Sequence, residues 1–96
     1  MSPVKKKKLI KLRKQLDHLD NVFIKLIKKR TVMVDKVLML KEFKNQIVDR
    51  KRIKIILNKI KRKSIQQNID QKITRRIWKN MIWSYINYER RNFKKK

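Results

Sequence analysis

Several features common in proteins are missing from this sequence. The 96 residues include no cysteine and no glycine, and the one proline is Pro3. The absence of cysteine excludes a disulfide framework and a thiolate metal site. Without glycine, and without the alternating β-branched pattern of strands, the sequence predicts an all-α fold. No run of about 18 apolar residues is present, and no signal-peptide pattern follows the basic N-terminus, so we expect a cytoplasmic protein with no membrane contact.

Acidic side chains are scarce, with 7 Asp and Glu against 31 Lys and Arg. A formal charge of +24 would suit binding to a phosphate backbone. However, the 22 lysines and the absence of alanine indicate strong A/T bias in the coding DNA, which would make lysine the default residue at solvated positions. We therefore do not expect a nucleic-acid partner, although a basic helical nucleic-acid-binding protein remains an alternative. The whole chain should form one domain, with frayed or disordered basic ends at 1–8 and 94–96.

Three helices with two short connections are predicted. The first should run from about Val4 to about Lys44, since no helix breaker follows Pro3. At 1.5 Å per residue it would be roughly 60 Å long, whereas a compact domain of this size has a radius of gyration of about 12 to 13 Å. Because two further helices of one chain cannot cover such a rod, we expect an intertwined helical homodimer.

The remaining two helices are predicted from local signals. After a connection at Asn45–Asp49, the second should span about Arg50 to Lys63. Asn68 suits the left-handed position that closes a helix, and Asp70 can cap the next one. The third helix should then run from about Gln71 to Phe93. Its expected inner face consists of Ile73, Ile77, Met81, Ile82, Tyr85 and Glu89.

An arginine interrupts the apolar stripe of the first predicted helix. The stripe advances in steps of four and three residues, and Arg30 occupies its sixth position. Burying an unpaired cation costs several kcal/mol, so an anion is expected nearby. With so few acids in the chain, a bound anionic ligand is the natural candidate. The stripe consists of Leu12, Leu16, Leu19, Phe23, Leu26, Arg30, Met33, Val37 and Leu40.

Helical angles relate the other inward polar residues. At about 100° per residue, Arg30 and Lys41 would share a face about 16 Å apart, and Tyr85 and Glu89 are neighbours one turn apart. Arg13 is turned about 100° away from Arg30, so it should not line the same side of its own helix. In a crossing dimer it could reach the pocket of the partner.

At these residues the chain resembles the all-helical chorismate mutase family. The resemblance covers about residues 12 to 90, and the ordered set of motifs with its spacings carries it. The family's opening signature is an arginine followed by two pairs of an apolar residue and an aspartate. The similar elements are Leu12–Asp20, Arg30, Lys41, the Asp-x-x-Arg stretch within Ile47–Arg52, and the turn and helix start at Asn68–Trp78.

The resemblance implies a homodimer with two shared pockets, each rearranging the dianion chorismate to prephenate in phenylalanine and tyrosine biosynthesis. This Claisen rearrangement needs no cofactor, metal or nucleophile. The implied roles are carboxylate binding by Arg30, Arg52 and Arg13 of the other protomer, and contact with the ether oxygen by Lys41 and Glu89. The implied catalytic residues are thus Arg30, Lys41 and Glu89, and the substrate-binding set is Arg13, Arg30, Lys41, Asp49, Arg52, Tyr85 and Glu89.

Two positions depart from the family pattern. Ile53 stands where typical members carry a glutamate that meets the substrate hydroxyl. The related isochorismate-pyruvate lyases share the fold and carry an apolar residue there, so a lyase remains an alternative. Glu89 stands where glutamine is common; an ionised carboxylate only accepts hydrogen bonds, so Glu89 must be protonated to donate to the ether oxygen.

Overall fold

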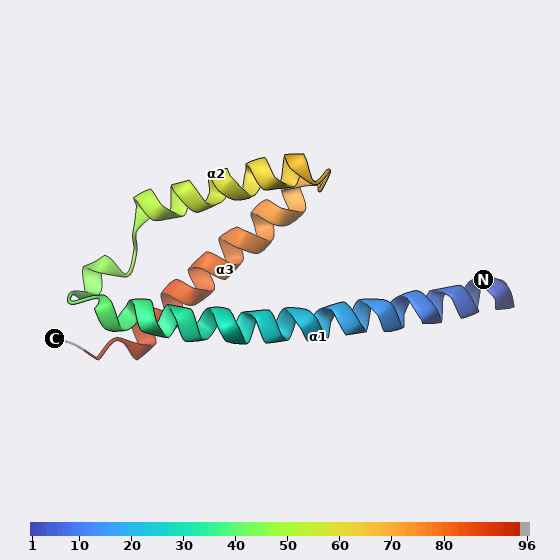
Figure 1. Cartoon of the computed structure of the whole chain (residues 1–96), viewed down its shortest axis with the longest axis horizontal. Helices are drawn as coiled ribbons and strands as arrows, with labels where there is room; N and C mark the ends of the chain where they lie inside the picture. Colours follow the sequence, from blue (N-terminus) through green and yellow to red (C-terminus); the bar gives the residue numbers. More distant parts are fainter. Residues whose placement is uncertain (95–96) are drawn as a thin grey trace. The chain divides into compact units, whose positions relative to one another are not determined.

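The computed structural model describes residues 1–94, and every regular element in them is helical (Figure 1). These elements are α1 (Pro3–Leu40), the short 3-10 helix η1 (Lys44–Gln46), α2 (Arg50–Gln66) and α3 (Gln71–Asn92). The all-α class with one very long N-terminal helix is therefore confirmed. Of the predicted basic end at 94–96, the last two residues lie outside the described residues.

The chain divides into two compact units, Met1–Met33 and Val34–Lys96. In the first unit, the start of α1 follows from local capping. The Ser2 hydroxyl accepts a hydrogen bond from the Lys5 N–H at 3.3 Å, and Pro3 takes the first helical position, where its missing N–H is not needed. The basic residues up to Lys8, expected to be frayed, are helical from Pro3 onward.

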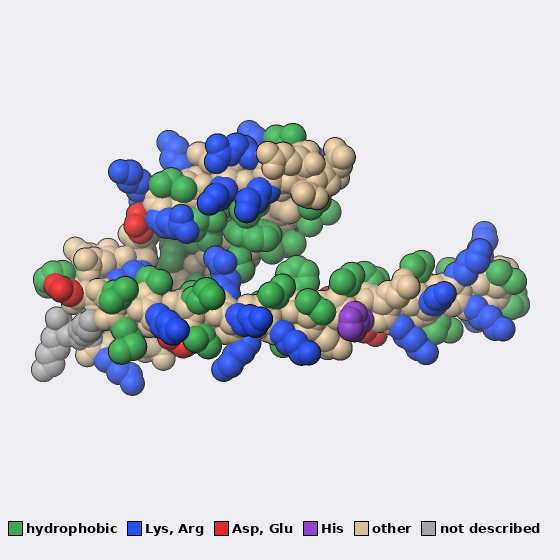
Figure 2. All heavy atoms as spheres, viewed as in Figure 1, with side chains coloured by type: hydrophobic (Ala, Val, Ile, Leu, Met, Phe, Trp, Pro, Cys, Tyr) green, Lys and Arg blue, Asp and Glu red, His purple; other side chains and the backbone are tan. Residues whose placement is uncertain are grey.

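The first unit exposes its apolar stripe. None of its residues is buried, and the apolar members of the stripe within it are 54 to 64% exposed. Figure 2 shows hydrophobic side chains along the length of α1, interspersed with lysines and arginines. This unit consists of helix without a core of its own. The members are Leu12, Leu16, Leu19, Phe23, Leu26 and Met33.

In the second unit, α1 ends at Leu40 and not at about Lys44 as predicted. The side-chain oxygen of Gln46 accepts hydrogen bonds from the backbone N–H groups of Glu42 (2.7 Å) and Phe43 (2.9 Å). A side-chain amide therefore fixes the chain in a non-helical connection, without the glycine or proline that usually marks such a boundary.

This earlier end changes the expectation for Lys41. Its backbone N–H bonds to the Leu38 carbonyl at 3.1 Å, and the residue lies in the connection that follows α1. The helical angle from Arg30 therefore does not extend to Lys41. The direction of the lysine side chain depends instead on its contact with α3.

Aspartates cap the starts of α2 and α3, and the sequence predicted this role for Asp70. Asp49 accepts from the Arg52 N–H and Asp70 from the Lys72 N–H, both at 2.9 Å. Asn68 has a φ of 54°, which confirms the predicted left-handed residue in the turn where the chain reverses between these helices (Figure 1). For these two helices, the predicted bounds differ from the structure mainly at the end of α2, which continues to Gln66.

A small core holds the second unit together. Its buried apolar residues come from the end of α1, the connection and α3, and half-buried residues of α2 pack against them. At the other end of the α2 and α3 pair, the Ser64 and Thr74 hydroxyls share a 2.7 Å hydrogen bond. The buried residues are Leu38, Ile47, Ile82 and Ile86, and those packed on them are Val48, Ile53, Ile56, Leu57 and Phe93.

The predicted inner face of α3 is only partly covered. Its C-terminal part is buried or half-buried, including Ile82 and Glu89. Ile73 and Ile77, however, are 56% and 45% exposed, so the prediction is wrong for the first turns of α3 within a single chain. None of the helices in residues 1–94 combines the length and the apolar character needed to cross a bilayer.

Candidate functional site

The second unit brings Lys41 and Glu89 together as an ion pair. The Lys41 Nζ lies 3.2 Å from both Oε1 and Oε2 of Glu89 and donates to each. Lys41 comes from the connection after α1, and Glu89 comes from the last turns of α3, 48 residues later. Both were predicted to act on the same substrate atom, and the fold places them in direct contact.

This pair is largely withdrawn from water. Glu89 is 6% exposed, and the side chain of Lys41 is 18% exposed. A buried charge is tolerated only with a partner, which each residue supplies to the other. An ammonium has three donors, so Lys41 can contact a third acceptor while it holds both carboxylate oxygens. The pair therefore offers a fixed cation near the protein interior.

A second polar contact joins the same two segments. The Tyr88 hydroxyl donates to Oδ1 of Asp35 at 2.6 Å, and both residues are half-buried. This hydrogen bond, followed by burial and the negative charge of Asp35, raises the pKa of Tyr88 above its ordinary value of 10.0. The Tyr85 ring meets the Tyr88 ring edge-on, with centroids 6.3 Å apart at 88°.

Sequence reasoning missed Asp35 and Tyr88. One signal was available, because Asp35 is one of only 7 acids and lies three residues before the buried Leu38. An acid at that spacing faces nearly the same side of the helix as the core residue. A signal also marks Tyr88, because at about 100° per residue it falls between Ile77 and Met81 on the predicted inner face of α3.

Asp49 and Arg52 have local roles in the structure. The Asp49 carboxylate accepts from the Arg52 backbone N–H and caps α2, and both residues are exposed. Neither side chain forms a hydrogen bond with the Lys41 and Glu89 pair in the part of the chain described. Ile53, the next residue, is half-buried against the core. Capping of α2 is thus sufficient to explain why an acidic residue stands at position 49, with no need for a bound ligand.

Arg13 and Arg30 belong to the first unit, where both side chains are exposed on α1. Arg30 keeps the position in the apolar stripe that the sequence indicated, one turn after Leu26 and one turn before Met33. Since the two units are placed independently, the contribution of these arginines to a pocket remains a prediction.

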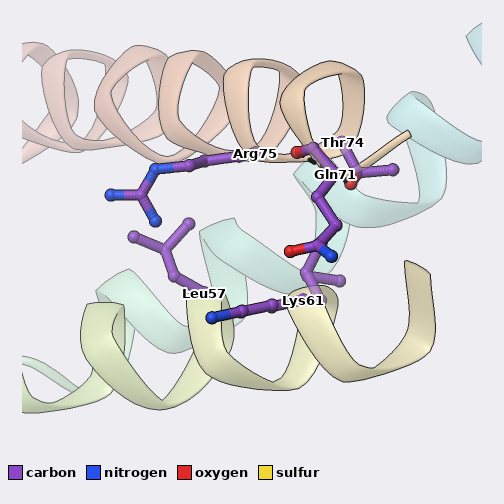
Figure 3. Close-up of a pocket in the computed structure, with 6 residues that line it drawn as sticks. Leu57, Lys61, Gln71, Thr74 and Arg75 are labelled. Carbon is purple, nitrogen blue, oxygen red and sulfur yellow. Dashed lines mark hydrogen bonds between the residues drawn. The ribbon is translucent and has the colours of Figure 1, made fainter. Parts of the chain in front are cut away.

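A shallow pocket lies between α2 and α3, away from the predicted residues. Figure 3 shows Leu57 between the side chains of Lys61, from α2, and Arg75, from α3, with Gln71 and Thr74 at the other end. An adjoining pocket shares Leu57 and Arg75 and adds Ile53. Over residues 1–94, no three His, Cys, Asp or Glu side chains gather in a way that could hold a metal ion.

Residues 12–90 match the chorismate mutase type II family. The chain belongs to this family. The matched region is nearly the whole chain and contains every predicted site residue from Arg13 to Glu89. No curated protein and no solved structure gives a significant match. The family match thus agrees with the resemblance that the ordered sequence motifs had indicated.

For a chorismate mutase type II chain, the structure holds one part of the expected pocket. Lys41 and Glu89 are in contact, and Tyr85 lies one helical turn before Glu89 on α3. The three arginines predicted to bind the substrate carboxylates are all exposed on the surfaces of their own helices, namely Arg13, Arg30 and Arg52. The predicted pocket would bring these arginines together around a ligand.

Proposed function

We propose that this chain is a chorismate mutase that rearranges chorismate to prephenate at sites shared within a homodimer. The observation that carries the proposal is the buried ion pair of Lys41 and Glu89 in a chain of the chorismate mutase type II family. These are the two residues that the family pattern assigns to the ether oxygen. Phenylalanine and tyrosine biosynthesis, in the cytoplasm, is the corresponding role.

The exposed stripe of α1 supports the homodimer. Fully burying a side chain such as leucine or phenylalanine contributes about 1.5 to 3 kcal/mol, and the first unit leaves its apolar stripe more than half exposed. Leu19 and Phe23, near its middle, are 57% and 56% exposed. The same stripe on a second copy is the complementary surface, because heptad-spaced apolar residues pack against one another.

Shared sites follow from the same arrangement. In a dimer formed along α1, Arg30 enters the interface among apolar residues, where an anionic ligand is a favourable partner for its charge. Chorismate supplies two carboxylates, which Arg30, Arg52 and the Arg13 of the second copy can bind. The two carboxylates thereby offset the repulsion among the arginines gathered at each site.

The chemistry requires orientation and one electrostatic contact. The rearrangement proceeds through a compact conformer, which fixed arginines on rigid helices can hold. As the C–O bond breaks, negative charge develops on the ether oxygen, and the Lys41 ammonium can donate to it. Protonated Glu89 would donate a second hydrogen bond, whereas ionised Glu89 keeps Lys41 in place. No cofactor or metal takes part in this scheme.

One observation favours a second candidate function. Ile53 packs against the core with an apolar side chain, so it offers no hydrogen bond at the position where most family members carry glutamate. The isochorismate-pyruvate lyases that share this fold also carry an apolar residue there. Removal of pyruvate from isochorismate is therefore the alternative reaction.

Incubation of the purified protein with chorismate and isochorismate in separate reactions tests both candidates. Dominant formation of prephenate from chorismate is the expected result, and Lys41→Met is the matched inactive control. Formation of salicylate and pyruvate from isochorismate at a higher rate would favour the lyase. Turnover of neither compound, together with duplex binding that weakens steeply with salt, would replace both enzymes by a nucleic-acid-binding protein.

A further inference from the structure

The contact of Tyr88 with Asp35 lies immediately beside the proposed catalytic pair. Tyr88 directly precedes Glu89 on α3, and Asp35 lies six residues before Lys41. Each contact joins the end of α1, or the residue just after it, to the last turns of α3. The two contacts therefore connect the same pair of segments.

These contacts act in different directions around α3. Successive residues of a helix are turned by about 100°, so Tyr88 and Glu89 leave the helix at different angles. A single contact would still allow α3 to rotate about its own axis relative to α1. A second contact at another angle restricts that rotation and so restricts where the Glu89 carboxylate lies.

The geometry of the Tyr88 contact suits this purpose. Its 2.6 Å length is typical of a hydroxyl that donates to a carboxylate, and such charge-assisted bonds are roughly twice as strong as neutral ones. A phenol is in its donating form at neutral pH, and the raised pKa of Tyr88 extends that form to more alkaline solution. The edge-on ring of Tyr85, a candidate substrate-binding residue, further restricts the Tyr88 ring.

We propose that Asp35 and Tyr88 are positioning residues that set the placement of Glu89 and Lys41 for the reaction. The inference rests on the proposed chorismate mutase function. Neither residue contacts the reacting atoms in this account. They act on the reaction only by orienting Glu89. Lys41, in contrast, donates to the ether oxygen directly.

The decisive variant is Tyr88→Phe, which removes one hydroxyl and keeps the ring. We expect kcat for chorismate to fall about 10-fold or more with KM changed less than about 2-fold, since a misplaced group costs most in the transition state. Asp35→Asn keeps an oxygen that can accept from Tyr88, so it should retain more activity than Asp35→Val.

Thr74→Val is the matched control. Thr74 shares a 2.7 Å hydroxyl hydrogen bond with Ser64 that also joins two helices, at the turn between α2 and α3. Its loss should lower the urea midpoint about as much as Tyr88→Phe does, with kcat unchanged. Equal losses of kcat in the two variants would show a general effect of stability and would overturn the positioning role.

A double-variant comparison tests the route through Glu89. In a Glu89→Ala background, Tyr88→Phe should have almost no further effect on kcat, because the group that it positions is gone. If the fold-losses in kcat of the two single variants multiply in the double variant, the inference is overturned. If the wild-type protein forms no prephenate, the proposed function is refuted, and the positioning role with it. If the wild type is active and Tyr88→Phe has the same kcat, only the positioning role is refuted.

Discussion

The buried ion pair predicts an asymmetry between the two substitutions that break it. Lys41→Met leaves the Glu89 carboxylate, 6% exposed, without its ammonium partner. Glu89→Gln leaves Lys41 with an amide oxygen that still accepts a hydrogen bond. Since the lysine side chain is 18% exposed, water can also reach it. Loss of Lys41 should therefore destabilise the protein more than loss of the Glu89 charge.

The magnitudes follow from burial and from the two 3.2 Å hydrogen bonds. Breaking a fully buried pair costs about 3 to 5 kcal/mol, whereas exposed pairs contribute about 0.2 to 1 kcal/mol. With Lys41 partly exposed, we expect about 2 to 3 kcal/mol for Lys41→Met. Glu89→Gln weakens hydrogen bonds without stranding a charge and should cost about 1 kcal/mol.

Urea unfolding followed by circular dichroism at pH 7 measures both costs. Protein concentration must be the same for all variants, because association contributes to the apparent stability of a dimer. A third variant, Lys41→Met with Glu89→Gln, removes both charges and should cost clearly less than the sum of the two single variants, because no carboxylate is left without a partner.

Two results would refute this reasoning. Equal costs for Lys41→Met and Glu89→Gln would show that Glu89 carries no charge in the free protein. A double variant whose cost equals the sum of the single costs would show that the two side chains do not interact, in spite of their distance. Either result would also remove the fixed cation on which the proposed chemistry depends.

Three further predictions concern single residues. Ile53→Glu should raise the affinity or turnover for chorismate through a contact with the substrate hydroxyl worth about 0.5 to 1.5 kcal/mol. The same substitution should lower the thermal midpoint, because Ile53 packs on the core. A clear loss of activity in folded protein would show that the pocket needs an apolar residue. If Glu89 donates a hydrogen bond to the ether oxygen, Glu89→Gln, whose amide N–H can also donate, should keep much more prephenate formation than Glu89→Ala. Wild-type activity in Glu89→Ala would remove Glu89 from the site. Because the pKa of Tyr88 is raised in the fold, the contribution of its hydrogen bond to stability is present below about pH 10 and is lost as pH rises through the folded-state pKa. The stability difference between wild type and Tyr88→Phe should therefore shrink in urea titrations at alkaline pH. A difference that stays constant with pH would contradict this.

Most of the helical fold could be predicted because its signals are local. The absence of glycine and the spacing of apolar residues predict the long α1, and Asn68 and Asp70 take the backbone roles that their chemistry favours. The end of α1 could not be predicted in the same way. It depends on hydrogen bonds from the backbone N–H groups of Glu42 and Phe43 to the Gln46 side chain, and a glutamine in the sequence does not predict that contact.

The candidate site was predictable where a polar residue interrupts an apolar face. Glu89 interrupts the inner face of α3, and the structure buries it against Lys41. Asp35 lies off the apolar stripe of α1, and 53 residues separate it from Tyr88 on the inner face of α3, so only the fold reveals their contact. Asp49, which the resemblance placed in the substrate-binding set, caps the start of α2 in the structure.

Complementation between two inactive variants tests the central claim, a chorismate mutase with sites shared between two chains. Arg13→Ala and Lys41→Ala should each abolish most activity as pure homodimers, since every site then lacks one cation. In a mixed dimer, the pocket of the Arg13→Ala chain keeps its own Lys41 and borrows an intact Arg13. With random exchange, half of the dimers are mixed and each has one working site of two, so co-refolding should restore up to about a quarter of wild-type prephenate formation. No recovery in samples whose heterodimers are confirmed by mass would contradict the shared site.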